Sequence, residues 1–254
     1  MAQWKRALVT GASAGIGREI AAQLARQGTE LVVVARRGDQ LEELAAEVSV
    51  PCEVLVADLG DLEQLAAVEA RLAAATDPID LLVNNAGFGF QGDFHELDLE
   101  RESTVVDVNI RALHRLSHVA ASTTASRGHG GILNVSSIAG FVGSPGTATY
   151  AASKAFVTSF TEGLHAELKP HGVHVSALCP GFTRTEFQEK ADYDTSGLPD
   201  VVWQSAADVA EIGLAGIAAN KPVVVPGAKN RVGASMINAL PGAARRFVVS
   251  RLPR

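Results

Sequence analysis

The stretch R-A-L-V-T-G-A-S-A-G-I-G, Arg6 to Gly17, decides the fold. It opens with a short β-rich apolar run, and an amphipathic stretch at 18–27 follows it. Glycines at a strand-to-helix turn permit positive φ angles and let the backbone approach a bulky anion, while the helix N-terminus offers free N–H groups. The spacing Gly-x-x-x-Gly-x-Gly differs from the commoner Gly-x-Gly-x-x-Gly, but strand, turn and helix occur in the required order. The stretch therefore predicts a dinucleotide-binding turn.

Beyond this turn, short β-rich runs alternate with longer amphipathic stretches. Strands are predicted at 6–10, 30–35, 52–57, 79–84, 131–136, 174–178 and 222–226. Helices are predicted at 18–27, 40–48, 62–75, 102–125, 150–169 and 206–220. Near-continuous Val, Leu and Ile in the strands is typical of a parallel sheet covered on both faces. We predict a single doubly wound, Rossmann-type α/β domain over residues 1–254, with about seven parallel strands.

The composition of the chain argues against several classes of function. The 254 residues are 47% hydrophobic and 20% charged, and the net charge of -6 argues against a nucleic-acid partner. We expect neither a signal peptide nor a membrane-spanning helix, because no apolar run is long enough. The histidines lack metal-ligand spacing, so no metal site is expected. Cys52 and Cys179 lie in separate apolar runs, which indicates buried free thiols and a reduced, cytoplasmic protein.

Two arginines, Arg36 and Arg37, end the second predicted strand. About 20 residues after the glycines, NAD-binding folds place an acid for the ribose 2′-hydroxyl, whereas an arginine suits a 2′-phosphate. A guanidinium pairs with phosphate through two hydrogen bonds and stacks on adenine. The pattern therefore favours NADP(H) over NAD(H), and the alternative is a solvated charge pair that opens the next helix.

Tyr150 and Lys154, in Y-A-A-S-K, are four residues apart and so share one helix face. Alone this pair is a weak signal, but several other motifs accompany it. They are T-G-A-S-A-G-I-G (10–17), N-N-A-G (84–87), Asn109 in D-V-N-I, S-S-I-A-G (136–140) and P-G-F-T-R-T (180–185). Together, and in this order, they resemble the single-domain branch of the short-chain dehydrogenase/reductase family.

The resemblance implies catalytic roles for four residues. Tyr150 resembles the acid/base that exchanges a proton with the substrate oxygen, and Lys154 the residue that lowers its pKa and holds the nicotinamide ribose. Ser137 resembles the serine that hydrogen-bonds the substrate oxygen, and Ser136 is its rival. Because adjacent strand residues point to opposite faces, only one of the two can line the site, and Ser137 is favoured. Asn109 resembles the asparagine that links Lys154 to solvent through water.

The resemblance also implies the cofactor contacts. Asp58 resembles the acceptor for the adenine amino group, with a helix N-cap as the competing role. The other expected contacts, besides Tyr150 and Lys154, are Gly11, Ser13, Gly15, Ile16, Gly17, Arg36, Arg37, Leu59, Asn85, Ala86, Gly87, Pro180, Gly181, Thr183 and Thr185. In the reducing direction the family transfers hydride from NADPH while the tyrosine protonates the developing alkoxide, with no metal.

Aromatic and aliphatic residues near these motifs indicate an apolar substrate pocket. Its expected members are Phe88, Ile138, Phe141, Phe182 and Phe187. We therefore expect a small lipophilic carbonyl or secondary alcohol as substrate. The alternatives are reduction of a 3-oxoacyl thioester carried on ACP or CoA and, from another class, a non-catalytic NADP(H)-binding sensor or scaffold.

Two segments carry further expectations. Residues 190–204 form the least regular stretch and are expected to be a substrate lid. The C-terminal extension, 231–254, contains Arg245, Arg246, Arg251 and Arg254 among apolar residues. It is expected to dock or to contact another subunit, with peripheral membrane binding as the less favoured alternative. By analogy with the family, helices near 102–125 and 150–169 imply a homodimer or homotetramer.

Overall fold

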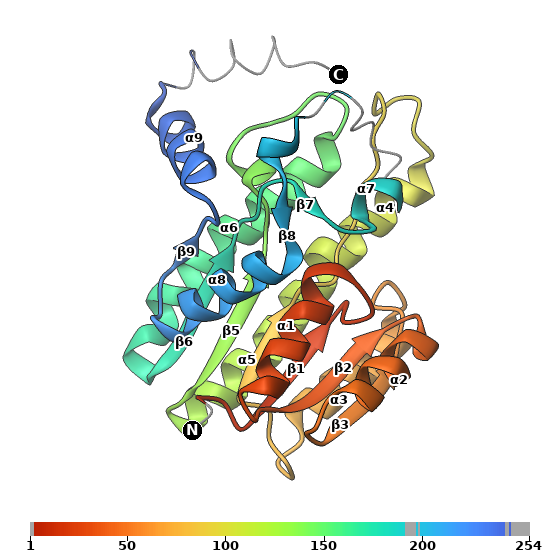
Figure 1. Ribbon diagram of the computed structural model, residues 1–254, viewed down its shortest axis with the longest axis vertical. Helices are drawn as coiled ribbons and strands as arrows, with labels where there is room; N and C mark the ends of the chain where they lie inside the picture. The colour runs from red at the N-terminus through yellow and green to blue at the C-terminus, as the bar shows by residue number, and fades with distance from the viewer. Residues whose placement is uncertain (1–2, 191–196, 198, 242–243, 245–254) are drawn as a thin grey trace.

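Seven parallel strands form the central sheet. The computed structural model describes residues 3–190, 197, 199–241 and 244 (Figure 1). The spatial order of the strands is β3 (Cys52–Val56), β2 (Glu30–Ala35), β1 (Arg6–Thr10), β4 (Leu81–Asn84), β5 (Gly130–Val135), β6 (Val173–Leu178) and β9 (Val223–Val224). Every neighbouring pair is parallel. This arrangement confirms the predicted doubly wound fold.

Helices bury both faces of the sheet, as the apolar strands require. In β1, Ala7 and Val9 join the core of one face and Leu8 joins the core of the other. The first face packs against α1 (Gly15–Arg26), α2 (Gly38–Glu47) and α8 (Ala206–Ala218). The second packs against α3 (Leu62–Ala73), α5 (Leu113–Arg127) and α6 (Ala148–Leu168) (Figure 1).

The strand order reverses beside β1. β2 and β3 extend the sheet on one side of β1, whereas β4 begins the other half. In open α/β sheets this reversal leaves a crevice at the carboxyl ends of the two strands, and ligands bind there. The glycine-rich turn follows β1 directly, and the N-N-A-G motif begins with the last residue of β4.

The helix predicted at 102–125 is longer and is not uniform. It consists of α4 (Leu99–Val106), a π-helical turn (Asp107–Ala112) and α5, which continue into one another. Asn109 lies in the π-helical turn. Such turns are rare and frequently occur at functional sites.

The carboxyl-terminal third adds small elements above the sheet (Figure 1). β7 (Thr183–Arg184) pairs with β8 (Gln204–Ser205), and α7 (Phe187–Lys190) lies between them in the chain. α9 (Ala228–Ala239) follows β9 and was not predicted. Within the predicted lid, residues 191–196 and 198 lie outside the described residues, as do Arg245, Arg246, Arg251 and Arg254 of the tail.

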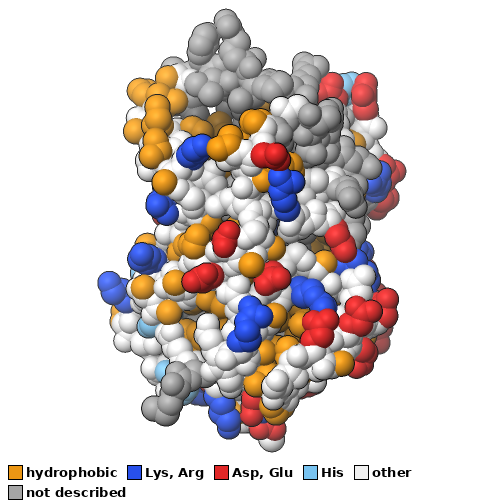
Figure 2. Space-filling model, in the orientation of Figure 1, with side chains coloured by type: hydrophobic (Ala, Val, Ile, Leu, Met, Phe, Trp, Pro, Cys, Tyr) orange, Lys and Arg blue, Asp and Glu red, His pale blue; other side chains and the backbone are white. Residues whose placement is uncertain are grey.

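The surface is mixed in charge. On the face in Figure 2, acidic and basic side chains are interspersed rather than gathered by sign. Among the described helices, none combines the length and the apolar character that a membrane crossing needs. Both cysteines are free thiols; Cys179 is buried, as expected, but Cys52 is only half-buried.

Gly216 allows α8 to pack tightly on β9, and its replacement tests this packing. A Cβ at Gly216 would lie 2.3 Å from Cγ2 of Val224. We expect Gly216→Ala to lower the free energy of unfolding by about 1–3 kcal/mol, although alanine is the better helix former. Urea unfolding measures the change. Ala215→Gly, at the exposed neighbouring position, is the control and should cost only about 0.5–1 kcal/mol; a stabilised Gly216→Ala protein would contradict the packing.

Candidate active site

A cavity of about 820 Å³ opens at the carboxyl edge of the sheet. Segments that follow β1 to β6 all contribute to its walls. The predicted site residues that line it are Gly11, Ser13, Gly15, Ile16, Arg36, Arg37, Asp58, Leu59, Asn85, Ala86, Gly87, Phe88, Ser137, Ile138, Phe141, Tyr150, Lys154, Pro180, Gly181, Phe182, Thr183, Thr185 and Phe187. The structure thus brings nearly all of them together; Gly17 and Asn109 lie behind the wall.

The glycine-rich turn has the geometry of an anion cradle. Gly11 and Gly15 adopt φ angles of +66° and +56°, a region that side chains rarely tolerate. A Cβ at Gly11 would lie 2.9 Å from Cα of Ala86, so only glycine fits. No side chain caps the start of α1, and its first turn holds no acid. The free N–H groups and the bare backbone fit the phosphates of a dinucleotide.

Gly17 allows Gly11 and Asn85 to pack closely against the start of α1. A Cβ there would lie 2.4 Å from the carbonyl oxygen of Gly11 and 2.3 Å from Nδ2 of Asn85. That same Nδ2 donates to the carbonyl oxygens of Thr10 and Gly11 at 3.0 and 3.2 Å. Asn85 therefore fastens the end of β4 to the glycine turn. Its neighbour Asn84 is buried and donates into the helix and strand behind it.

Arg36 and Arg37, which follow β2, lie at one end of the cavity, and each is beside an acidic side chain. Arg36 is exposed, and its Nη1 lies 3.8 Å from Oδ2 of Asp58. Arg37 donates to Oγ of Ser13 at 3.0 and 3.3 Å and to Oε2 of Glu186 at 2.8 Å. The N-cap role considered for Asp58 is wrong. Asp61 caps α3, since its carboxylate accepts from the backbone of the helix's first turn.

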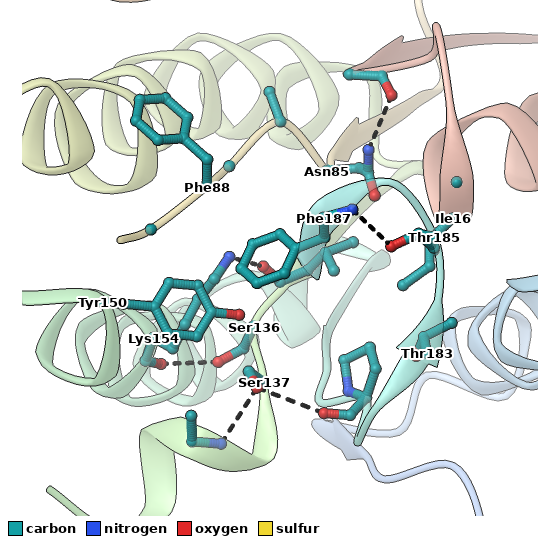
Figure 3. A pocket seen from close by; sticks show the side chains of 18 of the residues that line it. Ile16, Asn85, Phe88, Ser136, Ser137, Tyr150, Lys154, Thr183, Thr185 and Phe187 are labelled. Carbon is teal, nitrogen blue, oxygen red and sulfur yellow. Dashed lines mark hydrogen bonds between the residues drawn. The ribbon is translucent and has the colours of Figure 1, made fainter. Parts of the chain in front are cut away.

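Tyr150 and Lys154 stand one turn apart on α6 (Figure 3). The Lys154 ammonium nitrogen is buried, donates to the carbonyl oxygen of Val135 at 2.9 Å and lies 5.7 Å from the centroid of the Tyr150 ring. Burial lowers the pKa of Lys154 to about 8, and the neighbouring Cys179 acts weakly in the opposite direction. Lys154 therefore remains largely protonated at neutral pH beside the tyrosine.

The two candidate serines have different surroundings (Figure 3). Both border the cavity, but the Ser136 hydroxyl turns inward, where it donates to the carbonyl of Lys154 at 2.7 Å and contacts Thr158 at 2.7 Å. The Ser137 hydroxyl accepts from the backbone N–H of Ala139 at 3.1 Å and reaches the carbonyl of Pro180 only at 3.5 Å. Ser137 thus has the weaker internal contacts.

Asn109 is buried in the π-helical turn, behind the cavity wall. Its Nδ2 donates to the carbonyl of Phe88 at 2.9 Å and to Oγ of Ser153 at 3.0 Å. Its Oδ1 accepts from the N–H of Phe88 at 3.1 Å. Ser153 in turn donates to the carbonyl of Tyr150 at 2.7 Å. Asn109 therefore connects the strand end at Phe88 with the helix that carries Tyr150.

Aromatic rings form the opposite end of the cavity. The Phe187 ring lies 5.4 Å from the Tyr150 ring, centroid to centroid, and stands beside it in Figure 3. Phe88 packs against Phe90 at 5.6 Å. Ile138 and Phe141 come from the short helix that follows Ser137. The cavity thus has a charged end at the arginines and an apolar end at the tyrosine.

Comparison with known proteins places this arrangement in a family. The model of the family described as short chain dehydrogenase matches residues 5–196. This chain belongs to the short-chain dehydrogenase family.

Named relatives agree with this assignment. Oxidoreductase UcpA of Salmonella typhimurium is 36% identical over 189 residues, which cover 73% of this chain and 72% of that protein. A short-chain dehydrogenase from Sphingobium yanoikuyae in complex with NADPH has a TM-score of 0.84 and 35% identity, covering 98% and 96% of the two chains. A bulky-bulky ketone specific alcohol dehydrogenase from Comamonas testosteroni has a TM-score of 0.79 and 33% identity, covering 98% and 95%. The protein is therefore an oxidoreductase of this family.

The cavity of this short-chain dehydrogenase includes a helix that sequence reasoning missed. α9 lines it with Lys229, Asn230, Gly233, Ala234 and Ile237. Nδ2 of Asn230 donates to Oε1 of Gln204 at 3.0 Å, and it occupies the space beside Gly181. These lining positions recur at helical spacing, but most of them are not apolar, so the sequence carries no clear helical signal there. Glu186 was also missed, because nothing local in the sequence connects it with Arg37.

The shifted pKa of the buried Lys154 makes the stability of this dehydrogenase depend on pH, and this dependence can be measured. An unfolded lysine keeps its proton to about pH 10.4, whereas the folded pKa of Lys154 is about 8. Between these values the unfolded state binds more protons, so stability rises with pH. We expect the unfolding free energy of the cofactor-free wild type, relative to Lys154→Met, to increase by up to about 3 kcal/mol from pH 8 to 10.4. Urea unfolding at several pH values measures this difference.

Cys179 is the main competing group in that range. Burial raises its pKa to about 11, so it lowers stability as pH rises above 9. Both proteins contain Cys179, and the difference between them largely cancels its contribution. Parallel pH profiles of the two proteins would contradict the depressed pKa of Lys154.

Proposed function

We propose that this dehydrogenase transfers hydride between NADP(H) and a lipophilic carbonyl or secondary alcohol, with Tyr150 as the proton donor and acceptor. One observation carries the proposal. Tyr150, Lys154 and Ser137 line the same cavity as the glycine turn and the two arginines. A ligand that extends from the arginines past the glycine turn reaches the tyrosine, as a dinucleotide must.

Tyr150 performs the proton transfer. A free tyrosine titrates near pH 10, too high for efficient exchange at neutral pH. The protonated Lys154 beside it stabilises the negative phenolate by charge attraction. The hydrogen bonds of Asn109 to Phe88 and Ser153 hold this pair in position. Ser137 donates a hydrogen bond to the substrate oxygen, which its weak contact with Pro180 permits.

The cofactor is held along the carboxyl edge. Bound NADP(H) supplies or accepts the hydride. The first turn of α1 binds the phosphates, Arg36 and Arg37 bind the 2′-phosphate, and Asp58 accepts from the adenine. The remaining contacts are Gly11, Ser13, Gly15, Ile16, Leu59, Asn85, Ala86, Gly87, Lys154, Pro180, Gly181, Thr183 and Thr185. The Sphingobium relative, in complex with NADPH, supports this choice.

The substrate occupies the apolar end. Phe88, Ile138, Phe141, Phe182 and Phe187 form its walls. An apolar wall with a single cluster of polar groups suits a lipophilic molecule with one oxygen to position. The Comamonas relative, specific for bulky-bulky ketones, supports a ketone or the corresponding alcohol.

We extend the proposal to a cytoplasmic homo-oligomer that joins through α5 and α6. On the outer side of these helices the Phe156 and Phe160 rings stack at 5.6 Å, and His114 lies 5.4 Å from Phe160. Phe156 and Phe160 line a groove on α6 together with Leu164. A second copy of the same helices would cover it in an isologous interface.

Tyr150→Phe tests the proton transfer. The variant keeps the ring that packs against Phe187 and removes only the hydroxyl. We expect turnover of lipophilic ketones to fall by about 10²- to 10⁴-fold, because the alkoxide loses its proton donor. NADPH affinity should stay within about twofold of wild type by fluorescence titration. Unchanged turnover would exclude this mechanism, and wild type that binds NADPH without turning over any carbonyl would indicate a sensor.

Arg36→Ala tests the choice of cofactor. We expect wild type to bind NADPH at least about tenfold more tightly than NADH, and the substitution to remove most of that difference. The measurement is the dissociation constant of each reduced cofactor, followed by its fluorescence. Arg18→Ala is the control, because Arg18 pairs with Glu47 and does not line the cavity. If NADH binds wild type equally well, Arg36 is a solvated charge and the enzyme is NAD-linked.

A further inference from the structure

Glu186 lines the cavity and contacts Arg37 at its charged end. It lies 149 positions from Arg37 in sequence, yet Nη1 of Arg37 donates to its carboxylate at 2.8 Å. Its side chain is 45% exposed and that of Arg37 34%. The pair therefore joins the segment after β7 to the segment after β2, at the mouth of the cavity.

Each of the three guanidinium nitrogens of Arg37 donates a hydrogen bond. Nε and Nη2 donate to Oγ of Ser13 at 3.3 and 3.0 Å, while Nη1 is taken by Glu186. A guanidinium has only five N–H donors in a fixed planar fork. Three of these five donors are already used, so a phosphate on Arg37 binds beside Ser13 and Glu186. Ser13 is neutral, so Glu186 is the partner that a second anion opposes.

The neighbouring arginine differs in this respect. Arg36 lies 3.8 Å from Asp58, which is beyond hydrogen-bond distance, and its side chain is 68% exposed. A phosphate reaches Arg36 without breaking a hydrogen bond to that carboxylate. Arg37 is thus the arginine whose availability depends on a competing acid.

We propose that Glu186 competes with the 2′-phosphate of NADP(H) for Arg37 and thereby limits the preference for NADP(H) over NAD(H). The inference rests on the proposed function, because it takes the arginine pair as the 2′-phosphate site. Two anions on one guanidinium repel each other, and this repulsion weakens the binding of the 2′-phosphate. NAD(H) carries a neutral 2′-hydroxyl there and leaves the Arg37 to Glu186 pair in place.

The test is a double-mutant cycle on cofactor binding. Dissociation constants for NADPH and NADH are measured by fluorescence for wild type, Glu186→Gln, Arg37→Ala and the double variant. We expect Glu186→Gln to tighten NADPH binding by about three- to tenfold and to change NADH binding by less than about twofold. In the Arg37→Ala background the same substitution should leave the NADPH to NADH ratio unchanged.

A matched control distinguishes the loss of the contact between Arg37 and Glu186 from the loss of one negative charge. Asp200 is also an exposed acid on the carboxyl-terminal side, and it pairs with Arg184 at 2.6 Å. Asp200→Asn removes the same charge without touching Arg37, so the cofactor ratio should not move. Glu186→Asp, which keeps the charge, should stay close to wild type, and circular dichroism confirms that each variant is folded.

Two results would overturn the inference: Glu186→Gln leaves the ratio unchanged, or it tightens both cofactors equally. The ratio is measurable whichever cofactor wild type prefers. Failure of the proposed NADP(H) preference appears instead in wild type and Arg36→Ala, as equal binding of the two cofactors. The two failures are therefore distinguishable in one set of titrations.

Discussion

The burial of the Lys154 ammonium group constrains the centre of this dehydrogenase. A buried charge is costly unless hydrogen bonds replace its water, and the carbonyl oxygen of Val135 at 2.9 Å provides one. The space around it is equally restricted. A Cβ at Gly87 would lie 3.2 Å from the ammonium nitrogen and 3.0 Å from Oδ1 of Asn109. The ends of β4 and β5, the π-helical turn and α6 therefore meet at one charge, and each must keep its position for the charge to stay bound.

The fold was predictable because its signals are local. Each strand is a short apolar run and each covering helix has its own amphipathic period, so the sheet follows from the run of elements after the glycine turn. Most cavity residues were predictable for a related reason, since motifs that end parallel strands meet at one edge. The π-helical turn was not predictable. Its six residues carry the same periodicity as the helix around them, and only the contacts of Asn109 with Phe88 and Ser153 distinguish it.

The other features that the sequence did not predict are of two kinds. In the first, two neighbouring residues compete for one role; in the second, two residues far apart in the sequence make contact. Asp58 and Asp61 are equally good caps by residue type, and the actual start of α3 decides for Asp61. Strand alternation suggested that only one of Ser136 and Ser137 borders the cavity; both do, and the direction of the hydroxyl distinguishes them. The contact between Arg37 and Glu186 joins segments with no common motif, so only the folded chain reveals it.

Three consecutive residues connect the two ends of the cavity. The Thr185 side chain lies against the glycine turn, where a Cβ at Gly15 would be 2.9 Å from its Cγ2. Glu186 binds Arg37, and Phe187 packs against the Tyr150 ring. These three contacts come from one short stretch of backbone, so the position of that stretch sets all of them together. The charged end at Arg36 and Arg37 and the apolar end that holds Tyr150 are thus joined by one short covalent segment, although different strands line them.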